Sequence, residues 1–507
     1  MTASRRHVWF ACLLAIVGIA AGRHAGADSS HAAMPAAYER WQAVQQRLHD
    51  VAVERHVHPS QGFAAPAAVS AGPMEAAVTV RSVRRISRDS TAPRPGSEPD
   101  TEVEPDVAVD PDDDDVVVAV FQQNRFPNGG AVATGYATSH DGGDTWVTAP
   151  LPGVTRAREG PWARASDPAV AFGPDGSVYV SSLTISRDRC TTGIMVQRSD
   201  DGGLTFETPV QVERHAGCDV SNDKEWITVD TFPASPHFGR IYVVWSRITG
   251  NDEPLQIRHS DDRGRTWTSR VQLSGNRSGV GVLPLVQPNG DLTVVYTNLN
   301  SLPLRGVART SRDGGSTFGA EVVIGNNLAS SPSDLRVGEF LVTAAVDPVT
   351  GELYAGWADT RFRSDGLNDV LLWKSGNGGG SWSGPVKVNG DGSGSGIDKF
   401  TPDVAVHGGI VHATYRTRTR EEDRDSNLVY TAYQISTDGG RSFGAPVRLG
   451  ARTALRWAAE ADGLSFLGDY QGVAATAGGA YAVWCRASRP PGEGAYHQTA
   501  WSAALER

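Results

Sequence analysis

A single eight-residue pattern returns along this chain at a nearly constant interval. It reads Ser-x-Asp-x-Gly-x-Thr-(Trp/Phe) and is complete at 139–146, 199–206, 260–267 and 311–318. Two looser copies at 375–382 and 436–443 have Asn377 in place of the aspartate and Ser442 in place of the threonine. The leading serines are about 50 to 65 residues apart, a spacing that indicates a repeat architecture.

The pattern has the chemistry of a tight turn between antiparallel strands. Its aspartate can accept hydrogen bonds from nearby backbone N–H groups, and its glycines can adopt positive φ angles. We therefore predict that each copy joins two strands of one structural unit. We assign these copies no catalytic role.

From about residue 78 to its end the chain resembles the sialidase-like proteins with Asp-box, or bacterial neuraminidase, repeats. The resemblance implies an all-β fold, a single β-propeller of four-stranded antiparallel blades. In that family the box joins the third and fourth strands of a blade, on the face opposite the active site. It also implies a carbohydrate-active protein, in the strongest form an exo-α-sialidase-type retaining glycoside hydrolase.

Composition agrees with a turn-rich all-β protein, because the 507 residues include 57 glycines and 29 prolines. The formal net charge is −10 and no basic stripe is present, which argues against a nucleic-acid partner. No His/Cys cluster has zinc-ligand spacing, and no cofactor is predicted. The acidic run at 110–115 matches no EF-hand loop and is interpreted as a solvated turn rather than a calcium site.

The first 27 residues predict a signal peptide. Arg5 and Arg6 precede an apolar run at 8–21, and Ala-Gly-Ala at 25–27 is a cleavage site before Asp28. The expected product is a secreted monomer, extracellular or periplasmic, with no membrane insertion after cleavage. Residues 28–77 are expected to form one amphipathic helix and an Ala/Pro-rich linker. Residues 78–507 form the predicted propeller.

Three cysteines lie beyond the signal peptide. Export permits disulfides, and the strand pattern places Cys190 and Cys218 in two loops on one face of neighbouring blades. We predict a bridge between them and a buried thiol at Cys485.

Strand-like segments of the first repeat fall at 104–110, 116–122, 132–138 and 146–151, and the later repeats follow the same order. A seventh unit at 472–504 has three such segments and no box. An open sheet edge favours aggregation, so we predict that 78–87 supplies its fourth strand. The prediction is therefore seven blades, with the six of the sialidases as the alternative.

Functional groups are expected where first strands begin and second strands end, around the mouth of the central channel. By resemblance to sialidases, Tyr470 is the candidate nucleophile, with Glu225 or Glu339 as its base and Asp223 or Asp167 as acid/base. An arginine cluster would hold the sugar carboxylate. The substrate-binding candidates are Arg125, Arg247, Arg361, Arg416 and Asp469, with the cluster itself drawn from Arg247, Arg361 and Arg416.

Two alternatives stay open. The Arg-Ile-Pro signature of sialidases is missing, since Arg85-Ile86-Ser87 lacks the proline. A propeller without catalysis that binds glycan or protein at an extracellular surface is therefore the second hypothesis. Charged residues at strand ends also cap backbone groups or pair across blades, which gives each candidate a structural interpretation as well. Trp245, Trp357 and Trp484 are expected to be blade core.

Overall fold

The computed structural model describes residues 78–250, 252–276, 279–419 and 428–507. The helix, linker and signal peptide predicted for residues 1–77 lie outside the described residues. The described chain consists almost entirely of β-strands, with two short 3₁₀ turns, η1 (Arg156–Arg158) and η3 (Leu455–Trp457). No helix among the described residues is long and apolar enough to cross a membrane.

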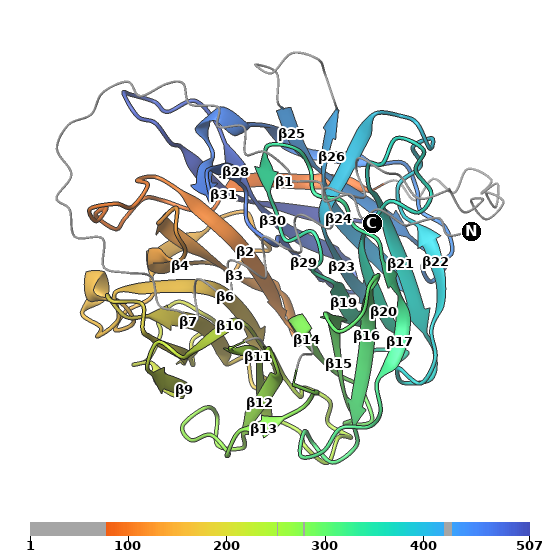
Figure 1. Cartoon of the computed structure of the whole chain (residues 1–507), viewed down its shortest axis with the longest axis horizontal. Helices are drawn as coiled ribbons and strands as arrows, with labels where there is room; N and C mark the ends of the chain where they lie inside the picture. Colours follow the sequence, from red (N-terminus) through yellow and green to blue (C-terminus); the bar gives the residue numbers. More distant parts are fainter. Residues whose placement is uncertain (1–77, 251, 277–278, 420–427) are drawn as a thin grey trace, which may run out of the picture. The chain divides into compact units, whose positions relative to one another are not determined.

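Most strands form four-stranded antiparallel sheets in which consecutive strands are neighbours, as Figure 1 shows. The first two sheets are β2 (Glu102–Asp110), β3 (Asp113–Arg125), β4 (Ala131–Ser139) and β5 (Val147–Pro150), then β6 (Arg164–Phe172), β7 (Val178–Ile185), β8 (Thr191–Ser199) and β9 (Val210–Ala216). A single pair between Ala131 and Ala165 links these two sheets.

The next four sheets repeat this order along the chain. They are β10 (Val220–Val229), β11 (Ile241–Thr249), β12 (Leu255–Ser260) and β13 (Val271–Gln272); β14 (Gly279–Val286), β15 (Leu292–Asn298), β16 (Leu304–Ser311) and β17 (Val322–Asn327); β19 (Thr343–Val346), β20 (Leu353–Asp359), β21 (Asp369–Ser375) and β22 (Ser383–Lys387); and β23 (Ile397–His407), β24 (Ile410–Thr419), β25 (Leu428–Ser436) and β26 (Val447–Ala454).

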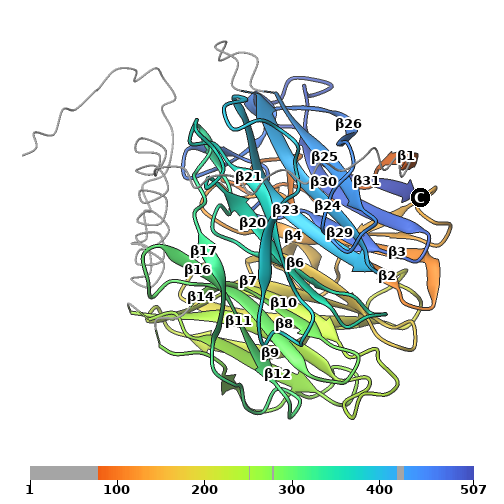
Figure 2. The same cartoon turned by 90° about the vertical axis from the view of Figure 1, so that its right-hand side faces the viewer.

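One further four-stranded sheet joins the first strand of the described residues to their last strands. It contains β29 (Gly472–Ala475), β30 (Gly479–Ala487), β31 (Gln498–Glu506) and β1 (Thr79–Arg85). Strand β1 pairs antiparallel with β31, with Val83 opposite Ala503, and Figure 2 shows the two strands side by side. The predicted pairing of the segment from residue 78 with the C-terminal strands is confirmed.

A smaller three-stranded sheet lies apart from this pattern. It contains β18 (Leu335–Arg336), β27 (Ala459–Ala461) and β28 (Leu464–Phe466), and β18 runs parallel to β28. Because β18 precedes β19 and β28 precedes β29, this sheet ties together the segments that lead into two first strands. Sequence analysis did not predict it, since two- and three-residue strands leave no periodic pattern.

The register places the repeated turns at one end of the sheets. Val109 of β2 is opposite Val117 of β3, which is opposite Ser139 at the end of β4, while Glu102 is opposite Gln123 at the other end. The equivalent serines each lie opposite the beginning of a second strand: Ser199, Ser260, Ser311, Ser375 and Ser436. The starts of first strands and the ends of second strands therefore lie at the opposite end from the turns, as predicted.

The turns have the hydrogen bonds that their sequence predicts. Asp141 accepts from the backbone N–H of Thr145 at 2.8 Å and from its hydroxyl at 2.6 Å. Ser139 donates to Asp141 and accepts from the N–H of Gly143 at 2.8 Å. Gly142 and Gly143 have φ angles of 68° and 85°, where glycine is unstrained.

Alternating apolar residues of adjacent sheets form the core. The second strands carry its largest side chains, and Trp245, Trp357 and Trp484 are at most 1% exposed. Trp357 stacks on Trp373 with ring centroids 3.7 Å apart. The prediction that these three second-strand tryptophans are core residues is confirmed. With its four-stranded antiparallel sheets, the fold is all-β and consistent with a propeller.

Candidate functional site

Three first strands share a bulge at which a charged residue lies in the left-handed region. Glu104 of β2, Asp167 of β6 and Lys224 of β10 have φ angles of 53°, 45° and 51°. Each lies where the register with the second strand shifts. Such a conformation costs about 1–3 kcal/mol per residue and persists only where the surrounding structure enforces it.

The three bulged side chains meet in one buried ion cluster. The ammonium of Lys224 lies 2.9 Å from Asp167 Oδ1, 3.6 Å from Glu104 Oε1 and 2.6 Å from Asp469 Oδ2. Arg336 of β18 forms an ion pair with the other oxygen of Asp469. We call Glu104, Asp167, Lys224, Arg336 and Asp469 the buried ion cluster.

Burial and charge act in opposite directions on Lys224. Burial lowers the pKa of its ammonium, but the carboxylates of Asp167 and Glu104 outweigh that effect and raise it. Lys224 is therefore a cation throughout the physiological range. Burial, followed by repulsion from Asp167, raises the pKa of Glu104.

Two cavities adjoin the buried ion cluster. The central cavity, of about 410 Å³, is lined by residues from the first strands of all the four-stranded sheets, including Asp106, Glu225 and Asp403. The charged cavity, of about 70 Å³, is lined by Glu104, Arg125 and Arg336 among others. Asp167, Lys224 and Asp469 line both cavities.

Tyr470 and Glu225 line the central cavity together. The phenol of Tyr470 donates to the carbonyl oxygen of Pro168 at 3.0 Å, and its ring packs edge-on against Trp226, with centroids 5.3 Å apart. Burial, and then the carboxylates of Glu104, Asp167 and Glu225, raises the pKa of Tyr470. In this state Tyr470 is a neutral phenol.

Glu225 is 1% exposed, and neither of its carboxylate oxygens has a hydrogen-bond partner among the described residues. Burial, reinforced by Asp167, raises its pKa well above the usual range. Burial therefore favours the neutral form of this carboxyl group.

The other two predicted acids, Asp223 and Glu339, do not line the central cavity. Asp223 lines the charged cavity beside Lys224. Glu339 accepts from the hydroxyl of Ser331 at 2.6 Å and lines neither cavity. Of the two candidate bases, only Glu225 shares a cavity with Tyr470.

The predicted arginine cluster is not assembled at the cavities. Arg361 pairs with Asp359 at 2.7 Å, and Arg416 is buried and donates to the carbonyl oxygen of Cys485 at 2.7 Å. Arg247 faces Asn222 across the sheet. These three arginines line neither cavity.

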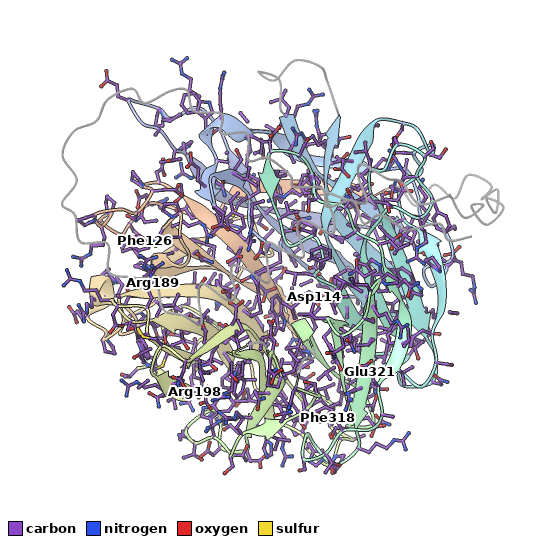
Figure 3. The ribbon with its side chains drawn as sticks, viewed as in Figure 1. Asp114, Phe126, Arg189, Arg198, Phe318 and Glu321 are labelled. Carbon is purple, nitrogen blue, oxygen red and sulfur yellow. A yellow bond between two sulfur atoms is a disulfide. The ribbon has the colours of Figure 1, made fainter. Side chains whose placement is uncertain are left out.

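Arg125, a predicted substrate-binding residue, and Arg336, which was not predicted, lie at the charged cavity instead. Arg125 and Arg336 both stack on the ring of Phe466, with guanidinium carbons 4.1 and 5.0 Å from its centroid. Both line the charged cavity, as does Arg189 from the segment between β7 and β8. Figure 3 shows Arg189 well apart from Phe318 and Glu321.

Sequence reasoning missed Glu104, Arg336 and Gln471. A signal for the first existed, because Glu104, Asp167 and Thr401 each precede a proline at the equivalent place of a first strand. No such signal marked Arg336, which lies in a two-residue strand. Gln471 follows Tyr470 and lines the central cavity.

The predicted disulfide between Cys190 and Cys218 is present, and Cys485 is a buried free thiol. The bridge fixes the segment that carries Arg189 against the segment leading into β10. In the acidic turn, Asp110 and Asp113 accept from the backbone N–H groups of Asp112 and Asp115. Among the described residues, no group of three or more His, Cys, Asp or Glu is arranged to hold a metal ion.

The sheets and their register define the class as an all-β protein with a propeller-like fold. A protein of unknown function from Dyadobacter fermentans is similar over 85% of this chain and 99% of its own, with 14% identity and a TM-score of 0.44. An intramolecular trans-sialidase from Ruminococcus gnavus is similar over 65% of this chain and 92% of its own (14% identity, TM-score 0.43). An α-L-arabinanase from Penicillium chrysogenum is similar over 69% and 98% (13% identity, TM-score 0.45). No model of a protein family and no curated protein matches the chain.

Proposed function

We propose that the protein is a secreted carbohydrate-active β-propeller of seven blades, closed by β1. Contacts between first strands support the ring, since they run from β2 through β6, β10, β14, β19 and β23 to β29 and back to β2. The central cavity, lined from all seven of these strands, lies where the channel of such a ring would be. The pairing of β1 with β31 supports closure.

The proposed activity is that of a retaining, exo-α-sialidase-like glycoside hydrolase acting on acidic glycans. One observation carries it: a tyrosine and two carboxyl groups of suitable type, Tyr470, Glu225 and Asp167, line one cavity beside a set of cations. An acidic sugar needs both parts, a positively charged subsite for its carboxylate and a nucleophile with proton-transfer partners.

Each group has a defined part in the proposed reaction. The oxygen of Tyr470 attacks the anomeric carbon while the carboxylate of Glu225 takes the phenol proton. Asp167, which takes up a proton from solvent when its ion pair with Lys224 opens, donates that proton to the departing glycosidic oxygen. Asp167, now a carboxylate, then removes a proton from a water that cleaves the tyrosyl–sugar bond. The tyrosine leaves as phenolate and recovers its proton from Glu225.

The charged cavity is the proposed subsite for the sugar carboxylate. Arg125 and Arg336 both pack against the ring of Phe466, which limits the motion of both guanidinium groups. Arg336 is already paired with Asp469, so a bound carboxylate would compete with that aspartate. The proposal therefore moves the arginine role from Arg247, Arg361 and Arg416 to Arg125 and Arg336.

The second candidate is a propeller that binds a glycan without cleaving it. The bond from the Tyr470 phenol to the Pro168 carbonyl favours this candidate, because a nucleophile must be released from that bond before it can attack. Under this alternative the two arginines still bind an acidic sugar, and the buried ion cluster only supports them.

The test is release of 4-methylumbelliferone from its α-sialoside by the purified protein. Hydrolysis by the wild type and a fall of at least about a hundredfold in Tyr470→Phe are expected. Tyr481→Phe is the matched control, since Tyr481 donates to the Asp114 carbonyl at the end of the sheets that carries the turns. Absence of turnover by the wild type, or full activity in Tyr470→Phe, would overturn the proposed reaction.

Binding separates the two candidates. Sialic acid binding that is weakened in Arg125→Met while no sialoside is cleaved would support the non-catalytic propeller. Export has its own test: the protein secreted by the expressing cell should begin at Asp28, as determined by mass spectrometry of the intact chain.

A further inference from the structure

The central cavity has a built site that the proposed reaction does not fully use. Gln471 is 2% exposed and lines this cavity, and neither atom of its amide has a hydrogen-bond partner among the described residues. Glu225 lines the same cavity, and its two carboxylate oxygens likewise have no hydrogen-bond partner among the described residues. Leaving such a group buried and unpaired costs about 1–3 kcal/mol, more for a charged group.

The acids around this cavity outnumber the bases. Its lining includes Asp106, Asp167, Glu225, Asp403 and Asp469 against the single ammonium of Lys224. Lys224 and Arg336 compensate Asp167 and Asp469, which leaves three carboxyl groups without a cation at contact distance among the described residues.

The three remaining acids, Asp106, Asp403 and Glu225, differ in the hydrogen bonds that their carboxyl groups already accept. Asp106 accepts from the backbone N–H of Val170 at 2.9 Å, and Asp403 accepts from the N–H of Val473 at 2.8 Å and from the hydroxyl of Thr343 at 2.6 Å. These bonds join neighbouring first strands and are structural. Within the part of the chain that the structure describes, only Glu225 of these three acids accepts no hydrogen bond from another residue, so it is the acid that a ligand would satisfy.

The walls select the chemistry of that ligand. Apolar side chains such as Val282 and Leu285 line much of the cavity, and Trp226 offers an aromatic surface next to Glu225. Aromatic rings attract cations, and a cavity of about 410 Å³ is within the usual range of small-molecule sites, roughly 300–1,000 Å³. A bare metal ion does not fit, because no group of three acidic, His or Cys ligands exists among the described residues.

We propose that the central cavity binds a small organic cation, a primary amine of about monosaccharide size, with its ammonium on Glu225 and a polar group on Gln471. This inference does not depend on hydrolysis, because binding requires no bond to be broken. A bound ammonium would also keep Glu225 ionised in the presence of its other charged neighbours, Asp167, Asp223 and Lys224, and of the phenol of Tyr470.

The test uses glucosamine as the probe and glucose as its neutral counterpart. By isothermal titration calorimetry at pH 7, glucosamine is expected to bind the full secreted chain saturably and glucose at least about tenfold more weakly. Equal binding of both sugars, or no saturable binding of glucosamine, would overturn the inference.

Two variants locate the site. Glu225→Gln keeps the size of the side chain and should weaken glucosamine binding by at least about tenfold, and Gln471→Leu should weaken it to a smaller extent. Glu253→Gln is the matched control, since Glu253 is also a buried acid but does not line the central cavity. Unchanged binding in both Glu225→Gln and Gln471→Leu contradicts the inference, while sialoside hydrolysis is scored separately with Tyr470→Phe.

Discussion

The two ends of the sheets use the same backbone conformation for opposite purposes. At the end with the repeated turns, glycines such as Gly142 and Gly143 adopt positive φ angles without strain. At the other end, Glu104, Asp167 and Lys224 adopt them at a cost. Equivalent bulges carry Gly281 in β14 and Thr401 in β23, so the bulge itself does not require a charged residue.

The difference indicates that the charged bulges are retained for their side chains. The turn aspartates are exposed or partly exposed and accept three or more local hydrogen bonds, which lower the pKa of Asp141 to about 2, first through Thr145. Asp106 and Asp403, which follow the bulges of β2 and β23, are buried, and burial raises the pKa of each to about 7. One end is built for local stability, whereas the other keeps costly charges close together.

The largest expected effect is at the buried ion cluster. Lys224→Met removes the cation shared by Glu104, Asp167 and Asp469, and the unpaired carboxylates should lower the free energy of unfolding by about 3–5 kcal/mol at pH 7. Urea unfolding followed by tryptophan fluorescence measures this change. Lys374→Met is the control, because its partly exposed pair with Glu352 is worth about 0–1 kcal/mol. Equal losses of unfolding free energy in Lys224→Met and Lys374→Met would contradict the difference between the two ends of the sheets.

A smaller effect is expected in the pH dependence of stability. Burial raises the folded-state pKa of Asp106 from 3.8 to about 7, so its contribution to stability is complete below about pH 4 and is lost as pH rises toward 7. Asp106→Asn should therefore flatten the fall of the urea midpoint between pH 4 and pH 7. The amide oxygen can still accept from the N–H of Val170.

Asp313 provides the contrasting titration. Hydrogen bonds, first from Thr317, lower its pKa to about 2, so its contribution is present above about pH 4 and is lost as pH falls toward 2. Asp313→Asn should lower the urea midpoint by a constant amount above about pH 4 and change the slope of the curve only below it. The same pH window for both variants would show that the two ends do not differ electrostatically.

Loss of a single turn aspartate should cost less. Asp201 accepts from the N–H of Thr205 at 2.9 Å and from the hydroxyls of Thr205 and Ser199. Asp201→Ala should lower the free energy of unfolding by about 1 kcal/mol, and sialoside hydrolysis should be unchanged because the turn lies at the far end of the sheet. A change in activity greater than about twofold would contradict the separation of the two ends.

The smallest expected change in stability is at the turn 375–382, in which Asn377 stands in place of the aspartate. Asn377 accepts from the N–H of Ser381 at 2.9 Å and donates to its hydroxyl. Asn377→Asp replaces neutral hydrogen bonds by charge-assisted ones and should stabilise the protein by about 0.5 kcal/mol. Thermal unfolding above pH 5 measures the gain, and Asp438→Asn in the neighbouring copy should give the reverse change.

Much of the fold was predictable from the sequence because its signals are local. The turn residues at 139–146 and the alternating apolar residues of strands such as β11 determine where each strand begins and ends. The pairing of Cys190 with Cys218 followed from placing two loops on one face. The extra strand from residue 78 followed from the unpaired edge of the last sheet.

Less of the site was predictable. Tyr470, Glu225 and Asp167 were predicted at first-strand starts; Asp167 and Glu225 lie within β6 and β10, Tyr470 precedes β29, and all three line one cavity. Of the predicted arginines only Arg125 lines a cavity. Arg416 turns inward to the Cys485 carbonyl, whereas the unpredicted Arg336 comes from a two-residue strand. A one-residue bulge also reverses the face to which every later side chain of a strand points, and periodicity alone does not reveal it.

The sequence by itself determined the strands, the repeated turns and the end of the sheets at which charged residues gather, because each depends on neighbours within a few residues. Only the tertiary structure decided which charges meet. The contacts of Lys224 with Asp167 and Asp469 join residues 57 and 245 positions apart, and they depend on how separate first strands lie against one another. Side-chain direction over such separations is set by packing, which the order of residues along one strand does not record.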